Sequence, residues 1–381
     1  DHLQERYMDT YYRTVYAVSQ QMNVASTFAR IDPQTVEKIL AVPWLGSEFS
    51  SRIWADKDKL LRELTQTLSR GLVRGDSLDR MTKEFAKRMS VSESRAAVLI
   101  HTESAHIAAE ASMKGYRETG VKEYRFLATL QLKTCSICGM LDGRVFKFSE
   151  RETGVNFPPM HPQCHCTYTG VTEFNIGDKR AARDPVTGKS GTVPKNMTWE
   201  EWHKKYVEDD PAGALADKKY KNRHGDSKQY DRYVDRLGSK NVPKTLDAFQ
   251  TLKYTEPEKW KTLQRAYRDQ PIRDHIQSDA QPKTIEVGKQ GKHIREHNNY
   301  IQGRSYLTIS VDEAQTLVNR HAGTGELLRD TKNKWKHQEL IRTKQQIGVD
   351  VDQLTGEERP TTDFKIHYSN KGVHIVPYKE R

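Results

Sequence analysis

The chain has 381 residues, a formal net charge of +11, a pI near 9.2 and a mean hydropathy of −0.84. This length predicts two or three domains, because one core rarely extends over so many residues. The polar composition and the lack of a long apolar run exclude a membrane-spanning helix. No basic segment followed by an apolar one begins the chain, so no signal peptide is predicted. The positive charge is compatible with a nucleic-acid partner.

The first 130 residues are predicted to be helical. The stretch "DSLDRMTKEFAKRM" places apolar residues at helical spacing behind an N-cap at Asp76 or Ser77. A second helix is expected to begin at a capping box formed by Ser90 and Glu93. Within that helix, "HTESAH" separates its His and Glu residues by two, three and five positions. These offsets do not suit a metal site on one helix face, so a buried or capped polar cluster is expected there.

All four cysteines lie in two short stretches, "KTCSICGMLDGRVFKF" and "PPMHPQCHC". Two disulfides would call for an export signal, and a redox Cys-x-x-Cys would call for a βαβ context; neither is found. Cys-x-x-Cys followed by His-x-x-Cys-x-Cys is instead the spacing of a structural zinc site with four tetrahedral ligands. The candidate ligands are Cys135, Cys138, His161, Cys164, Cys166 and His165. The preferred set is the first three with either Cys164 or Cys166, because those two are expected to point in opposite directions on an extended segment.

The segment "KEYRFLATLQLKTCSICGMLDGRVFKF" alternates polar and apolar residues, which predicts short strands around the cysteines. Together, "HTESAH", "YRFLATLQLKTCSICGMLDGRVF" and "PPMHPQCHC" resemble the Mu F-like minor head protein family of tailed phages, over roughly residues 60–170. The chain departs from the family pattern at His101 and His165, where arginine is common. Neither position belongs to the preferred set of ligands.

This resemblance implies a virion component inside the phage head, near the portal, that assists head morphogenesis and DNA packaging or delivery. Its implied partners are the portal and head proteins, with packaged DNA as a further one. The implied location is the virion, and the host cytoplasm during assembly or after delivery.

Residues 171–275 are predicted to be a basic helical linker or arm, rich in Lys, Asp, Gly and Pro. Thr198, with Glu201 three residues on, predicts the start of a short helix. Two longer helices follow, with a break at Pro257 that Thr255 is expected to cap.

From about Gln281 the pattern becomes α+β. It predicts a strand and a turn, a second strand at "SYLTI", and a helix begun by Ser310. The last stretch, "DFKIHYSNKGVHIVPY", predicts a hairpin that turns at "SNKG".

The register of this hairpin follows from its hydrophobic pattern. If Ile366 faces Ile375, one face is apolar throughout, and His367 then lies opposite His374 on the polar face. A slip by one residue would mix the two faces. A bulge at Gly372 would break this register.

Six of the fourteen histidines lie in residues 281–381. Histidines with Lys and Arg on strands suit metal-independent RNA cleavage. One imidazole takes the proton of the 2′-OH, another protonates the leaving 5′-oxygen, and a cation stabilises the phosphorane. The plain alternative is a basic domain with solvent-exposed histidines.

"KHI", "NNYIQGRSYLTIS", "HAGTGE", a stretch expected to be helical ("KWKHQELI") and "KIHYSNKGVHIVP" resemble the polymorphic toxin type 50 domain, over about residues 280–381. The resemblance implies a ribonuclease of the barnase/EndoU/colicin/RelE-like class, with RNA as substrate and an immunity protein of unknown kind. The active-site residues carried over from it are His293, Arg304, Ser305, Lys365, His367 and His374. Which of them act as acid and base stays open.

The predicted fold class is therefore multi-domain α+β. Its parts are a mainly helical region (1–130), a small zinc-stabilised β unit of the same module (131–170), a linker (171–275) and a C-terminal α+β toxin-like domain (276–381). The predicted function is a phage minor head protein that carries a metal-independent ribonuclease domain. The alternative is a purely structural virion protein whose basic C-terminal domain binds packaged DNA without catalysis. An HNH-type nuclease at the cysteines is not supported, because no catalytic His precedes an Asn-bearing ββα unit there.

Overall fold

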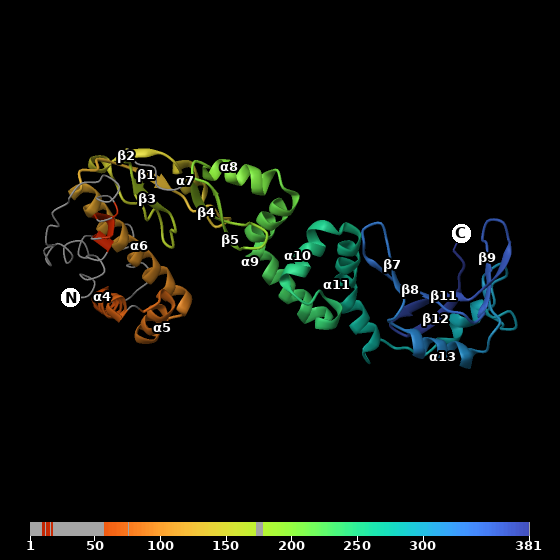
Figure 1. Cartoon of the computed structure of the whole chain (residues 1–381). Helices are drawn as coiled ribbons and strands as arrows, with labels where there is room; N and C mark the ends of the chain where they lie inside the picture. Colours follow the sequence, from red (N-terminus) through yellow and green to blue (C-terminus); the bar gives the residue numbers. More distant parts are fainter. Residues whose placement is uncertain are drawn as a thin grey trace. The chain divides into compact units, whose positions relative to one another are not determined.

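The computed structural model describes residues 10, 11, 13–15, 17, 57–74, 76–172 and 178–380 (Figure 1). The chain separates into two compact units, with the boundary between Lys221 and Asn222 inside helix α9 (Pro211–Leu237). The first unit is mainly helical and the second ends in sheets, as the predicted α+β class requires. Among these described residues, no helix has the length and apolarity needed to cross a membrane.

Three helices form the core of the first unit: α4 (Lys57–Arg74), α5 (Leu78–Met89) and α6 (Glu93–Glu118). Ser77 is the N-cap of α5, as predicted, since its Oγ accepts from the N–H of Arg80 at 3.2 Å. The capping box predicted at Ser90 is wrong. Ser90 closes α5 in the left-handed conformation, and Ser92 precedes α6. The rest of the predicted helical region, 1–9 and 18–56, lies outside the described residues.

A small antiparallel sheet of order β2-β1-β3 packs beside α6, as the alternating pattern predicts. Its strands are β1 (Glu123–Leu127), β2 (Val145–Lys147) and β3 (Thr167–Gly170). A short helix, α7 (Ser136–Leu141), lies between β1 and β2, and a 3-10 turn, η1 (Phe148–Glu150), follows β2. Tyr124, Phe157 and Tyr168 form an aromatic core under the sheet, with ring centroids 4.7–5.5 Å apart.

Residues 178–208 pack on this module through their own small core. The hairpin β4 (Lys179–Arg183) and β5 (Ser190–Pro194) is followed by α8 (Trp199–His203) and a π-helical turn, η2 (Lys204–Glu208). Trp202 is buried against Leu130 and Val193. The capping box predicted at Thr198 is confirmed, with both of its hydrogen bonds to Glu201 present.

The second unit begins with a helical group. The C-terminal part of α9 is followed by η3 (Ser239–Asn241), α10 (Leu246–Thr255) and α11 (Pro257–Gln277). Tyr233 stacks on Tyr267 with ring centroids 4.2 Å apart, and Phe249 is fully buried beneath Tyr233. The break at Pro257 is confirmed, but Thr255 does not cap α11. It is the last residue of α10, and its hydroxyl donates to the Thr251 carbonyl.

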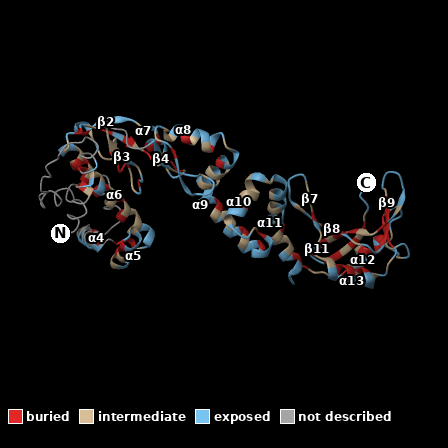
Figure 2. Ribbon diagram, viewed as in Figure 1, coloured by how far each residue is buried: buried red, intermediate tan, exposed pale blue. Residues whose placement is uncertain are grey.

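The remaining chain forms two antiparallel sheets, of order β12-β11-β8-β7 and β10-β9-β6, with a helix against the first (Figure 1). The helical elements are α12 (Val287–Gln290), η4 (Gly291–His293) and α13 (Val311–His321). The strands are β6 (Tyr306–Leu307), β7 (Glu326–Arg329), β8 (Trp335–Arg342), β9 (Gly348–Val351), β10 (Glu358–Thr361), β11 (Asp363–Ser369) and β12 (Gly372–Pro377). Buried residues concentrate between the four-stranded sheet and α13 (Figure 2).

Two predictions for this region are wrong, whereas the strand at "SYLTI" and the start of the following helix are confirmed. "KWKHQELI" is strand β8 rather than a helix, because β8 lies between β11 and β7 and buries Glu339, Leu340 and Ile341 in succession. The strand expected after residue 281 is reduced to one bridge, Ile285 to Val373. The helix α13 begins at the predicted Ser310, with a complete capping box.

The hairpin register is the predicted one. Ile366 pairs with Ile375, and His367 pairs with His374. The pairing continues without a shift to Ser369 and Gly372, so no bulge interrupts it.

Candidate functional site

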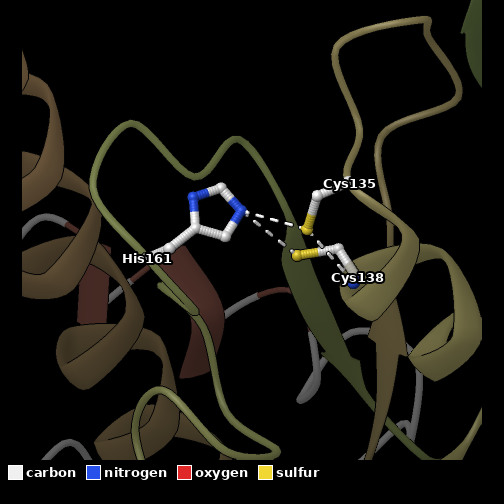
Figure 3. Close-up of side chains that lie close together, drawn as sticks. All are labelled: Cys135, Cys138 and His161. Atoms are coloured by element: carbon white, nitrogen blue, oxygen red, sulfur yellow. Dashed lines mark hydrogen bonds between the residues drawn. The ribbon is translucent and has the colours of Figure 1, made fainter.

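The first turn of α7 brings two cysteines together. Cys135 is the N-cap residue, and its Sγ accepts from the N–H of Cys138 at 3.4 Å. Cys138 is fully buried in the helix, while Cys135 is half-buried at its end. A Cys-x-x-Cys that opens a helix therefore directs both sulfur atoms to one point (Figure 3).

His161 faces these two sulfur atoms from a later loop (Figure 3). Its Nε2 lies 3.4 Å from Cys135 Sγ and 3.6 Å from Cys138 Sγ. Its Nδ1 lies 2.9 Å from the Pro162 carbonyl, to which it can only donate. This bond leaves the lone pair of Nε2 directed at the thiols, which is the tautomer that a metal-ligating histidine uses.

The other two cysteines lie on the same side, contrary to the expectation that they diverge. The sulfur atoms of Cys138 and Cys164 are 3.9 Å apart, and those of Cys138, Cys164 and Cys166 all lie within 4.8 Å of one another. The expectation was wrong in its geometry, because side chains alternate along an extended segment and residues two apart therefore lie on the same face. The hydrogen bond between Cys138 and Cys164 lowers the pKa of Cys164 and raises that of Cys138. The five residues form a Cys/His cluster that could hold a metal ion, and His165 is in neither triad of donors.

The cluster is tied to its surroundings by two residues that the sequence did not single out for this role. Thr102 of α6 accepts from the N–H of Gln163 at 2.9 Å, which anchors the loop carrying His161 and Cys164. The side chain of Asp142, which follows α7, is fully buried, and it receives both terminal nitrogens of Arg180 at 2.9 and 3.1 Å. The Asp-Gly pair after the second cysteine was the available signal for Asp142.

The "HTESAH" helix contributes a buried polar group, as predicted. Burial lowers the pKa of His106 to about 4, so its ring is neutral at pH 7. Glu110, one turn on, holds Arg151 through two hydrogen bonds of 2.8 and 3.1 Å. The metal-binding groups found among the described residues all come from the Cys/His cluster, and none includes a residue of this helix.

A second cluster of chemistry-bearing side chains lies in the second unit. His367 and His374 face each other across β11 and β12 with ring centroids 4.6 Å apart. His293, at the end of η4, stacks on His374 with centroids 5.9 Å apart. The structure thus brings together three of the six predicted catalytic residues, and His374 lies against both of the others.

These three imidazoles are neutral at pH 7. Burial, reinforced by neighbouring positive groups, lowers the pKa of His367 to about 4 and of His374 to about 3. Burial also lowers the pKa of His293. The Nδ1 of His293 donates to the Ser305 carbonyl at 2.7 Å, which leaves its Nε2 as the acceptor.

The other predicted residues have different surroundings. Ser305 is a structural residue: its buried hydroxyl donates to Asp350 at 3.1 Å and accepts from the N–H of Val351 at 3.0 Å. Lys365, two residues before His367 on β11, lies with its Nζ 3.5 Å from the ring centroid of Tyr378, and burial lowers its pKa. Arg304 is half-buried, and its charge contributes to the lowered pKa of His293.

Gln338 is a neighbour of the histidines that the sequence did not indicate. Gln338 lies on β8 directly opposite His367 of β11, and its amide nitrogen lies 3.4 Å from His367 Nδ1. Because β8 was predicted to be helical, no sequence argument could set Gln338 beside β11.

Comparison with known proteins finds two family matches. Residues 62–169 match the model described as Phage Mu protein F like protein, and residues 285–377 match the model described as Bacterial toxin 50. The chain is 22% identical to the NAD(+)--arginine ADP-ribosyltransferase EFV of Enterococcus faecalis (strain ATCC 700802 / V583) over 206 residues, which are 51% of this chain and 42% of that protein. It is 21% identical to the Minor head protein GP7 of Bacillus phage SPP1 over 216 residues, which are 53% of this chain and 70% of that protein. The match thus spans less than half the length of the first relative.

Proposed function

Because residues 62–169 carry a Mu F-like region and residues 285–377 a Bacterial toxin 50 domain, we propose that this chain is a phage minor head protein that carries a ribonuclease domain. As a phage head protein it associates with other head proteins in the virion. The proposal adds a role in head morphogenesis and in DNA packaging or delivery near the portal, supported by the similarity to a minor head protein. The activity named for the ADP-ribosyltransferase is not carried over, since the match spans 42% of that protein.

The observation that carries the ribonuclease proposal is the group formed by His293, His367 and His374. His367 and His374 are half-buried, while the Nδ1 of His293 donates to the Ser305 carbonyl. A neutral imidazole takes the proton of the 2′-OH as that oxygen forms a bond to phosphorus. A second imidazole delivers a proton to the 5′-oxygen as its bond to phosphorus breaks.

The acid must be protonated before it acts, and the buried imidazoles are neutral at pH 7. The negative charge of a bound phosphodiester raises the pKa of a nearby imidazole, so that one of the rings takes up a proton and can act as the acid. Lys365 lies on the same face of β11 as His367 and supplies a cation for the charge that develops on the phosphorane. No metal takes part in this sequence of steps.

The full-length chain is therefore expected to cleave single-stranded RNA in the presence of EDTA. His374→Gln should lower the rate by at least ~10²-fold, the ordinary contribution of one general acid or base. His224→Gln, an exposed histidine on α9, is the matched control and should cleave like the parent. Fluorescent RNA of defined sequence gives the rate.

Intact RNA with the parent protein would reject the ribonuclease. If the parent then bound duplex DNA in a salt-dependent manner, and the His374→Gln variant bound it equally well, the structural alternative would hold instead.

We further propose that the Cys/His cluster holds a structural zinc ion through Cys135, Cys138, His161 and Cys164. A tetrahedral zinc ion separates a sulfur and a nitrogen ligand by about 3.5 Å and two sulfur ligands by about 3.8 Å, given ordinary bond lengths. The distances to His161 Nε2, 3.4 and 3.6 Å, and the 3.9 Å between Cys138 and Cys164 fit these values, while Cys164 shares a triad of donors with Cys138 and not with Cys135 and His161. Four protein ligands make a closed site, so its effect is to stabilise the β unit.

Elemental analysis of the purified chain should find about one equivalent of zinc. Cys164→Ala should lose it, and Cys166→Ala, the matched change two residues on, should keep it. Zinc below about half an equivalent in the parent would refute the site, and the reverse result for the two variants would make Cys166 the fourth ligand.

A further inference from the structure

One short segment of the first unit exposes an unusual share of large apolar side chains. Ile137, Met140 and Val145 are 60%, 65% and 42% exposed. They are three of the eight large hydrophobic residues found exposed among the described parts of the chain, and they lie within nine consecutive residues. Ile137 and Met140 are three residues apart on α7 and so share one side of that helix. Exposed apolar side chains that cluster mark interaction surfaces more often than single ones do.

The surroundings of these side chains are basic. Arg125, Lys133 and Arg144 are all exposed, and Arg125 lies directly opposite Val145 in the β1–β2 pair. Asp142 is the one acidic residue between positions 132 and 147, and its carboxylate is fully buried against Arg180. The exposed charge between positions 132 and 147 is therefore positive.

The helix α7 of this segment is anchored by its contacts with His161 and Trp199. Cys135 and Cys138 direct α7 toward the Cys/His cluster, and Gly139 lies against the ring of Trp199, where an added Cβ would come within 2.3 Å of the ring. In the sheet of order β2-β1-β3, strand β2 is at the edge, and no described strand pairs with its outer side. A surface that is already ordered loses little entropy when a partner binds.

We propose that Ile137, Met140 and Val145, with Arg125, Lys133 and Arg144 around them, form a docking surface for an acidic protein surface of the phage head. A second copy of this chain would bring like charges together, which disfavours self-association through this surface. Nucleic acid would leave three large apolar side chains against phosphate, without a gain from burying them. This inference rests on the proposed head-protein function and adds the kind of partner and the residues that meet it.

The test uses the full-length chain and head shells purified from particles assembled without it. Binding is measured by co-sedimentation over a range of chain concentrations. Ile137→Asp/Met140→Asp should weaken binding by roughly thirtyfold, the effect of losing one strong contact residue. Arg144→Glu, which leaves the apolar side chains unchanged, should also weaken binding and should remove most of its salt dependence. Leu354→Asp is the matched control, since Leu354 is 95% exposed in the second unit, and it should bind like the parent.

Zinc content and circular dichroism identify a variant that has not folded, and Arg144→Glu still decides the question in that case. Full binding of both surface variants overturns the docking surface but leaves the head-protein proposal standing. A parent that does not bind the shells contradicts the head-protein proposal, and the docking surface with it. Binding that occurs only when the shells hold DNA, and is lost when they are empty, would identify nucleic acid as the occupant and overturn the acidic protein.

Discussion

Thr102 connects helix α6 to the loop that carries His161 and Cys164 through a single hydroxyl group. Its Oγ donates to the Val98 carbonyl at 2.5 Å and accepts from the N–H of Gln163 at 2.9 Å. Gln163 is the residue with positive φ that turns the loop so that His161 and Cys164 face the same point. The threonine of the Thr-Glu pair in "HTESAH" therefore positions the Cys/His cluster, although it is not one of the candidate metal ligands.

Thr102→Val keeps the shape of the side chain but leaves the Gln163 N–H without its acceptor. We expect the free energy of unfolding of the first unit to fall by about 0.5–1.5 kcal/mol, the net contribution of one hydrogen bond to stability. Chemical denaturation of the zinc-loaded chain measures this value. Thr251→Val is the control, because Thr251 makes the same bond to the carbonyl four residues earlier, on the exposed side of α10. An equal effect of the two changes would show that Thr102 acts only within its helix.

Residues with distinctive chemistry were the ones that the sequence could indicate. The four cysteines with His161, and the pair His367 and His374, were all predicted and do lie together. Asp142, Arg180 and Gln338 were not predicted. The role of a carboxylate, a guanidinium or an amide depends on its partner, and the sequence does not reveal that partner. Arg180 reaches Asp142 from 38 positions away in the sequence, and no pattern in the chain states that distance.

At the scale of elements, the β11–β12 hairpin couples its own stability to pH. Burial holds the pKa of His367 at about 4 and of His374 at about 3, whereas both titrate near 6.5 in an unfolded chain. Below pH 6.5 the unfolded chain takes up protons that the folded hairpin excludes, so the hairpin loses stability as the pH falls toward 4. Above pH 6.5 both states are neutral at these rings, and the histidines add no pH dependence.

Hydrogen exchange of residues 363–377 in the full-length chain should therefore show less protection at pH 5 than at pH 7, after correction for the intrinsic exchange rate. The variant His367→Gln/His374→Gln should lose much of this difference, while His224→Gln should keep it. A double variant with the same pH dependence as the parent would contradict the assignment of these two rings.

Elements set by neighbouring residues were predicted well. Thr198 and Ser310 begin their helices as predicted, and in each case a capping box forms with the residue three positions on. The prediction failed at Ser90, where the chain uses the same kind of residue to end one helix before it starts the next. It failed again at β8, because a central strand with both faces covered loses the alternation that identifies a strand.

A pair of related hairpin turns illustrates how much local sequence can decide. Asp184 opens the turn between β4 and β5, and Asp352 opens the turn between β9 and β10, each within an Asp-x-x-Thr-Gly stretch. In both, the aspartate accepts from the N–H groups two and three residues on. The same five-residue pattern thus gives the same turn in two unrelated sheets, because every contact it needs is within the turn.

At the scale of the whole molecule, the two compact units carry separate chemistry. The Cys/His cluster belongs to the first unit and the three histidines to the second, so metal binding and the proposed RNA cleavage do not depend on a shared site. This separation is why cleavage is expected to persist in EDTA. The domain limits near residues 130, 170 and 275 stay predictions, and residues 178–208 already pack within the first unit through Trp202 and Arg180.

The sequence by itself determined the α+β class, the composition of the Cys/His cluster and the register that sets His367 against His374. Each of these depends on residue type, on short spacing or on a period of two, and all three can be read directly from the sequence. Only the tertiary structure decided that the loop carrying Cys164 meets α7, that His293 joins the histidine pair, and that Thr102 and Asp142 hold the cluster in place. These features arise where segments far apart in the sequence meet, because the energy that selects them comes from packing and buried hydrogen bonds and not from the segments themselves.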